Sequence, residues 1–82
     1  MKFKDINITK RHDPKELGYV ELYDEYNDRY IHIIKYQKEG KYYQCETFKY
    51  MEEKNEYVTT GLQLLTDADL QNCIVTKENY EI

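Results

Sequence analysis

The alternation of aliphatic and tyrosine side chains in residues 19–36, YVELYDEYNDRYIHIIKY, is the feature that most constrains the fold. Successive side chains of a β-strand point to opposite faces, so this pattern predicts strands with one aliphatic face. A single helix is the alternative, because four positions also have helical spacing: Tyr19, Leu22, Tyr23 and Tyr26. The density of β-branched and aromatic residues favours strands, and Asn27-Asp28 fits a two-residue hairpin turn of type I′.

This turn sets the register of the predicted hairpin, and the register sets its two faces. Leu22 pairs with Ile33, and Tyr19 pairs with Tyr36. The predicted core face carries Val20, Leu22, Ile31 and Ile33. The predicted tyrosine face carries Tyr19, Tyr23, Tyr30 and Tyr36, with Glu21, Glu25 and His32 among them.

A second turn, Lys38-Glu39-Gly40, leads into a third strand, with Gly40 in the left-handed position of a three-residue loop. The core-face pairs are Ile33 with Cys45 and Ile31 with Thr47; the other pairs are Tyr36 with Tyr42, His32 with Glu46 and Tyr30 with Phe48. After the EEKN turn we expect a fourth strand from about Glu56 to Leu65. Because Val58, Leu62 and Leu64 share the parity of the tyrosine face, we expect part of that face to be covered.

The sequence near the two ends of the chain predicts short helices and strands. Residues 3–9 alternate around Ile6 and Ile8, as a first strand would. The DPKELG segment fits one helical turn, with Asp13 as its cap, Pro14 first, Glu16 closing a capping box and Gly18 at its end. Thr66 and Asp69 form another capping signature, which predicts a helical turn ending near Asn72 and a last strand at residues 74–76. A longer helix, which would align Leu70, Cys73, Ile74 and Lys77, is the alternative.

Together these segments predict one domain, residues 1–82, of the α+β class but mostly β. We expect a small twisted antiparallel meander sheet of about four to six strands with one or two short helical turns; a partly closed small β-barrel is the alternative. A chain of 82 residues has room for one modest core.

The charge and composition exclude several classes of function. A net charge of -4 argues against general nucleic-acid binding and against anionic membrane surfaces. No apolar run approaches the roughly 18 residues that span a bilayer, and MKFKDINITK lacks the apolar centre of a signal peptide. We therefore expect a cytoplasmic protein. Ten lysines against two arginines, with many residues of A/T-rich codons, are typical of a low-GC genome such as that of a phage or mobile element.

Neither a cofactor, a metal site nor an enzyme is predicted. The two cysteines and two histidines lie at least thirteen residues apart, whereas structural zinc ligands come in close pairs. Cys45 and His32 fall on opposite faces, and no phosphate loop or nucleophile motif occurs. His32 opposite Glu46 is interpreted as an ordinary cross-strand pair, and both cysteines as buried small hydrophobes.

These patterns favour a small acidic binding or inhibitor protein that docks on the basic surface of another protein. Tyrosine is enriched at interface hot spots, and acids supply a charged rim. The expected partner-binding residues are Tyr19, Tyr23, Asp24, Glu25, Tyr26, Asp28, Tyr30, Tyr36 and Tyr42.

Two other hypotheses compete with this one. A single-stranded nucleic acid would stack on the tyrosines and contact a basic hairpin tip made of Lys35, Lys38, Lys41 and Lys49. A structural role would have the chain form a homodimer through an exposed edge strand.

Overall fold

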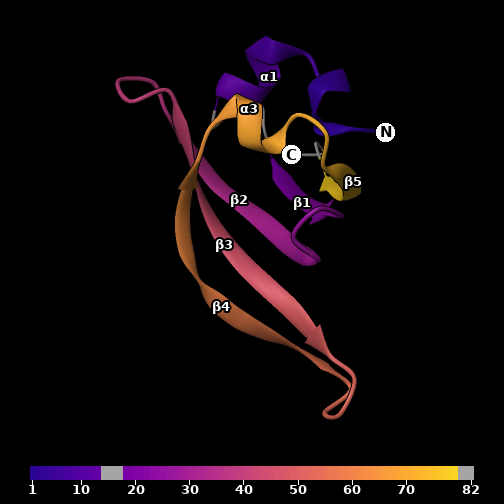
Figure 1. Cartoon of the computed structure of the whole chain (residues 1–82). Helices are drawn as coiled ribbons and strands as arrows, with labels where there is room; N and C mark the ends of the chain where they lie inside the picture. The colour runs from indigo at the N-terminus through magenta and orange to yellow at the C-terminus, as the bar shows by residue number, and fades with distance from the viewer. Residues whose placement is uncertain (14–17, 80–82) are drawn as a thin grey trace.

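The computed structural model describes residues 1–13 and 18–79, and its five strands form one open antiparallel sheet in the order β4-β3-β2-β1-β5 (Figure 1). The strands are β1 (Tyr19–Asp24), β2 (Arg29–Gln37), β3 (Tyr42–Met51), β4 (Glu56–Leu65) and β5 (Ile74–Asn79). The short helices are η1 (Phe3–Asp5), α1 (Ile8–His12) and α3 (Asp67–Leu70). The predicted mostly-β meander is confirmed, with β5 returning beside β1; the sheet stays open and does not close into the alternative barrel.

The core lies between one face of the sheet and the short helices. The predicted stripe of Val20, Leu22, Ile31 and Ile33 is buried there. Phe3 and Ile6 pack onto it from the N-terminal segment, and Leu70 packs from α3. The β3–β4 hairpin continues well beyond these helices, as Figure 1 shows. The described helices therefore cover only part of one face and leave the other face of the sheet open.

The prediction of a strand at residues 3–9 is wrong. Phe3–Asp5 forms the 3-10 turn η1, in which Asp5 Oδ2 accepts a hydrogen bond from the Lys2 backbone N–H at 2.9 Å. Asn7 then caps α1 by accepting from the Thr9 N–H at 2.8 Å. These short polar side chains compete with the strand ladder for the backbone. The predicted helical turn at residues 14–17 lies outside the described residues.

The first hairpin turn is wider than the predicted Asn27-Asp28 turn. Asp24 pairs with Arg29, so residues 25–28 form a four-residue loop, and Leu22 faces Ile31 rather than Ile33. The Asp24 carboxylate holds this loop: it accepts from Asn27 Nδ2 at 2.8 Å and from Arg29 Nε at 3.1 Å. The register is shifted by two residues, so both faces keep their predicted members in β1.

Two further corrections concern the second hairpin. The pairs Ile33–Cys45, His32–Glu46 and Tyr30–Phe48 are confirmed, as is Ile31–Thr47. A β-bulge after Ile33 then inverts the alternation of β2, so that Tyr36 faces Tyr43 instead of Tyr42 and is buried at 8% exposure.

In the turn of this hairpin, Lys41 takes the left-handed conformation predicted for Gly40. Gly40 has a different role: a Cβ atom there would lie 2.1 Å from the ring of Tyr42, so that ring would have to move. The glycine therefore allows a close approach between the turn and that ring.

The predicted bounds of the fourth strand are confirmed, but the predicted face of its side chains is confirmed for only part of the strand. A bulge opposite Thr47 places Val58 beside Lys49, off the tyrosine face. Leu62 and Leu64 do lie on that face, opposite Glu46 and Gln44, and are 73% and 60% exposed. The expected cover over this part of the face is therefore absent in the described structure. The short helix α3 with its Thr66–Asp69 capping box, followed by a strand, is confirmed.

A polar cluster around Asp67 fastens α1 and α3 to the sheet. Asp67 Oδ1 accepts from the hydroxyl of the fully buried Tyr43 at 2.9 Å, and Oδ2 lies 3.0 Å from His12 Nε2. Arg11 Nε lies 3.6 Å from the same carboxylate. His12 also stacks on Tyr36, with ring centroids 4.0 Å apart. Burial, and then the hydrogen bond to Asp67, strongly raise the pKa of Tyr43, so its hydroxyl remains a donor at neutral pH.

We predict that Asp67→Ala lowers the free energy of unfolding by about 1–3 kcal/mol, because it leaves the buried Tyr43 hydroxyl without its acceptor. Urea unfolding followed by circular dichroism measures this change. Glu39→Ala, in the exposed β2–β3 turn, is the control and should change stability by less than about 0.5 kcal/mol. Equal stability of the two variants would show that the cluster does not fasten the helices.

Candidate functional site

A row of tyrosines crosses the open face of the sheet. Tyr23 on β1 contacts Tyr30 on β2 with ring centroids 5.0 Å apart. Tyr30 meets Tyr57 edge to face at 5.1 Å, and Tyr57 meets Tyr50 at the same distance. We call these four residues the aromatic row. Because contacting rings restrain one another, the row forms a preorganised surface.

Two grooves flank Tyr30, whose ring is a wall of both. The first groove, of about 380 Å³, is bounded by Tyr19, Tyr30, Phe48 and Tyr57, with Glu21, Thr76 and Lys77 on the β5 side. The second, of about 260 Å³, lies between Tyr23, Tyr30 and Tyr50, with Asp28, Lys49, Met51 and Glu52 around it. Each groove therefore combines aromatic walls with at least one carboxylate.

Hydrogen bonds tie the phenols to these carboxylates. The Tyr23 hydroxyl donates to Asp28 Oδ1 at 2.8 Å, and this bond raises the pKa of Tyr23. Burial and the neighbouring Glu21 raise the pKa of Tyr19, whose hydroxyl donates to Glu21 Oε2 at 3.3 Å. Burial, together with a contact from Tyr57, raises the pKa of Tyr30. Tyr19, Tyr23 and Tyr30 thus present neutral rings beside acidic groups at neutral pH.

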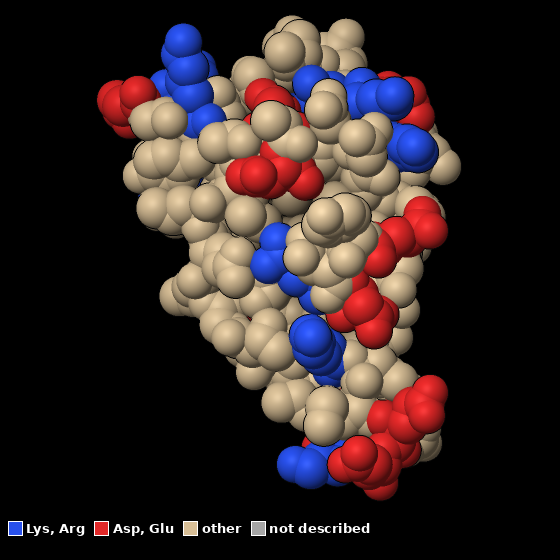
Figure 2. Space-filling view, viewed as in Figure 1, with Lys and Arg blue, Asp and Glu red and all other residues tan. Residues whose placement is uncertain are grey.

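The acidic turns meet at one end of the sheet, as the meander requires. Asp28 of the β1–β2 turn and Glu52 of the β3–β4 turn line the same groove. Figure 2 shows acidic side chains gathered at the tip of the β3–β4 hairpin, next to a basic one. The residues of that tip include Glu52, Glu53, Lys54 and Glu56. This end of the open face therefore has a negative rim.

The structure separates the predicted partner-binding residues into four groups. Tyr19, Tyr23, Tyr30 and Asp28 come together around the grooves. Tyr36 is buried against Tyr43 and is therefore not an exposed anchor. Three others lie elsewhere: Glu25 and Tyr26 in the β1–β2 turn, where Tyr26 is 96% exposed, and Tyr42 half-buried at the start of β3. Asp24 is buried and paired with Arg29, so it belongs to the turn's framework.

The four predicted lysines are exposed but do not form one tip. Lys38 and Lys41 lie in the β2–β3 turn, with Lys35 near the end of β2. Lys49 lies near the far end of β3, beside the second groove. At about 3.3 Å per residue, eight residues of strand separate Lys49 from Lys41 by roughly 26 Å. The basic cluster expected from the sequence is therefore divided between the two ends of the sheet.

Sequence reasoning missed Phe48, Tyr50 and Tyr57 as site residues. Tyr50 and Tyr57 are direct cross-strand partners flanking the EEKN turn. A register for that hairpin, counted outward from the turn, could have paired them. Tyr57 reaching over β3 to Tyr30 depends on sheet twist and bulging, which the sequence pattern does not specify.

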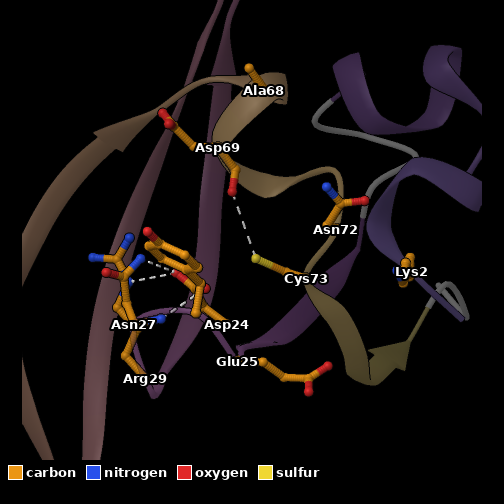
Figure 3. A pocket seen from close by; sticks show the side chains of 10 residues that line it. Lys2, Asp24, Glu25, Asn27, Arg29, Ala68, Asp69, Asn72 and Cys73 are labelled. Atoms are coloured by element: carbon orange, nitrogen blue, oxygen red, sulfur yellow. Dashed lines mark hydrogen bonds and ion pairs between the residues drawn. The ribbon is translucent and has the colours of Figure 1, made fainter.

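A separate cavity of about 660 Å³ lies between the β1–β2 turn and the segment joining α3 to β5 (Figure 3). Asp24, Arg29, Asp69 and Cys73 are among its lining residues, and Asp24 and Asp69 are already engaged within the chain. Both cysteines are free and buried, as expected, and burial raises the pKa of Cys45 to about 12 and of Cys73 to about 11. Such thiols are poor nucleophiles near neutral pH.

Metal-binding groups and membrane-spanning helices are both absent from the described residues. Residues 1–13 and 18–79 contain no group of three or more His, Cys, Asp or Glu placed to hold a metal ion. No helix in the same part of the chain has the length and apolar character to cross a membrane.

Comparison with protein-family models, curated proteins and solved structures gives no significant match. The geometry of the open face is therefore the basis for inferring a function.

We predict that Asp24→Asn destabilises the protein by about 1–3 kcal/mol at pH 7, whereas the isosteric Asp28→Asn changes stability by less than about 0.5 kcal/mol. Although desolvation raises the pKa of Asp24, hydrogen bonds from Asn27 and the Arg29 guanidinium outweigh it and lower the pKa. Because the pKa of Asp24 is lower in the folded state, its carboxylate stabilises the fold at pH values above its ordinary pKa. This stabilisation is lost as the pH falls through the folded-state pKa.

The difference in unfolding free energy between wild type and Asp24→Asn should therefore be largest at pH 6–7 and shrink below about pH 4. Urea unfolding midpoints measured across this range test this. A difference that stays constant down to about pH 2 would contradict the assigned role of the Asp24 carboxylate.

Proposed function

We propose that this chain is a small non-enzymatic binding or inhibitor protein whose open tyrosine face docks on a basic site of another protein. The supporting observation is the aromatic row with Asp28, Glu21 and Glu52 beside it. A lysine or arginine side chain is attracted both to the face of a tyrosine ring and to a carboxylate. Tyrosine also supplies contact area at low entropic cost.

The grooves define the side chains that the partner would insert. Each has room for a long side chain, and each has tyrosine walls with an acidic group at the edge. Tyr30 stands between them, so two neighbouring basic residues of a partner could flank one ring. The acidic β3–β4 tip would add long-range attraction toward a basic surface.

The biological setting is part of the same proposal. The chain is rich in lysine and in other residues that have A/T-rich codons, which fits a phage or mobile element. In that setting a small acidic protein that blocks a host defence factor would act in the cytoplasm. Genes for phage or defence functions beside the coding sequence would support this setting, and a neighbourhood of unrelated metabolic genes would oppose it.

A direct test titrates the protein with an arginine-rich hexapeptide and follows the tyrosine ring signals by NMR. We expect the signals of Tyr30 and Tyr50 to shift and to saturate, with a glutamate-rich hexapeptide giving no shift. Tyr50→Ala should weaken peptide binding about three- to fivefold, because it removes one wall of the second groove (about 0.5–1 kcal/mol).

Tyr26→Ala is the matched control, since Tyr26 is the more exposed ring but lies outside both grooves. Equal affinity of the two variants, or no saturable shift with the arginine peptide, would contradict the proposal. Binding of a single-stranded oligonucleotide that weakens steeply with salt and with Lys38→Glu and Lys41→Glu would favour the nucleic-acid hypothesis instead.

A further inference from the structure

The two edges of the sheet are unequal. At β5 the N-terminal segment pairs along the outer side: the Val75 N–H donates to the Met1 carbonyl at 2.8 Å and the Phe3 N–H to the Cys73 carbonyl at 2.9 Å. Lys2 also forms a bridge with Ile74. No described strand lies beyond β4, so a ten-residue edge, Glu56–Leu65, has unpaired backbone groups along its outer side.

This edge lacks most of the features that keep edge strands apart. Residues 57–65, YVTTGLQLL, contain no charge and no proline. Native edges are usually protected by lysines, prolines, inward charges or bulges. One bulge is present, where Gly61 has φ of 136° and Thr60 contacts Thr47. Beyond it Leu62 to Leu65 pair regularly with β3, and Leu62 and Leu64 lie exposed beside Ile34 in a shallow apolar hollow.

We propose that β4 pairs antiparallel with β4 of a second copy of this chain, giving a continuous ten-stranded sheet. Gly61 is the midpoint of the neutral stretch, so a two-fold axis near it matches 57–65 against itself. The acidic tip of one copy, which includes Glu52 and Glu53, then lies at the opposite end of the pair from the acidic tip of the other copy. Within residues 57–65, a second copy therefore pairs with this edge without opposing like charges.

The symmetry has a consequence for the open face. A two-fold axis perpendicular to a sheet reverses the strand direction and keeps each face on its own side. Both aromatic rows would therefore lie on the same side of the joined sheet. A single paired edge is a small interface, so we expect dissociation on the order of micromolar or weaker. The dimer does not depend on the proposed function, but it would make that face bivalent.

Sedimentation equilibrium from about 1 µM to about 1 mM tests the dimer. We expect the wild-type mass to rise toward twice the monomer mass. Leu62→Lys and Leu62→Glu, each tested separately, should weaken association at least tenfold, because each places two like charges near the axis. An equimolar mixture of the two variants should recover association, since opposite charges then meet across it.

Ile8→Lys is the matched control: Ile8 is 56% exposed on α1, which is not part of the sheet, and this variant should dimerise like the wild type. A wild type that stays monomeric over the whole range would overturn the proposal. So would variants at Leu62 that associate as tightly as the wild type. A mixture that stays monomeric while each variant keeps its native circular dichroism would also overturn the placement of the axis.

Discussion

The structure depends on one constraint: the helices of the described residues cover part of one face of the sheet and none of the other. The pleat sorts aliphatic side chains to one side and phenols to the other, and η1, α1 and α3 pack against the aliphatic side. The opposite side must therefore be stable in water. Tyrosine meets this requirement, because its ring contributes packing while its hydroxyl remains solvated or bonded to an acid.

A polar cluster holds the helical cover in place, in addition to the core contacts of Phe3, Ile6 and Leu70. Asp67 gathers Tyr43, His12 and Arg11 at one point, so the helices and the sheet share a single polar cluster. Phe3 packs edge to face on Tyr43 beside it, and the Arg11 guanidinium lies over the Phe3 ring. A small domain with one modest core relies on such clusters to fix where its short helices lie.

The alternation of side chains between the two faces of a strand correctly predicted the regular parts of the sheet. It failed where a bulge interrupts that alternation. The buried stripe from Val20 to Ile33, the pairing of Ile33 with Cys45 and the bounds of β4 were all predicted correctly in this way. Tyr36 was assigned to the wrong face because a bulge after Ile33 shifts the alternation by one residue. Local pattern does not specify bulges, since they depend on how neighbouring strands twist and pack.

The same limit applies to the turns, the N-terminus and the candidate site. Asp24 widens the first turn through its own hydrogen bonds, which a turn rule based on Asn27-Asp28 does not include. Residues 3–9 are too few for alternation to outweigh the capping by Asp5 and Asn7. For the site, Tyr19, Tyr23 and Tyr30 of the first hairpin were predictable, whereas the contribution of Tyr57 depends on contacts across three strands.

An open face and an open edge are linked features of this fold. Leaving one face uncovered produces the aromatic row, and ending the sheet at β4 leaves that row beside an edge whose residues 57–65 carry no charge. Each feature alone would be a weak contact site. The open face and the open edge are related because they belong to one continuous sheet: a strand that paired with the edge would also extend the open face.

Chemical nitration of the native protein at low concentration, read residue by residue by mass spectrometry, tests the division of the two faces most directly. Tyr50 and Tyr57 should be nitrated early, and Tyr36 and Tyr43 only after unfolding, because the first pair lies exposed and the second is buried. Nitration of Tyr36 and Tyr43 as fast as that of Tyr57, or protection of Tyr50 and Tyr57, would contradict this division.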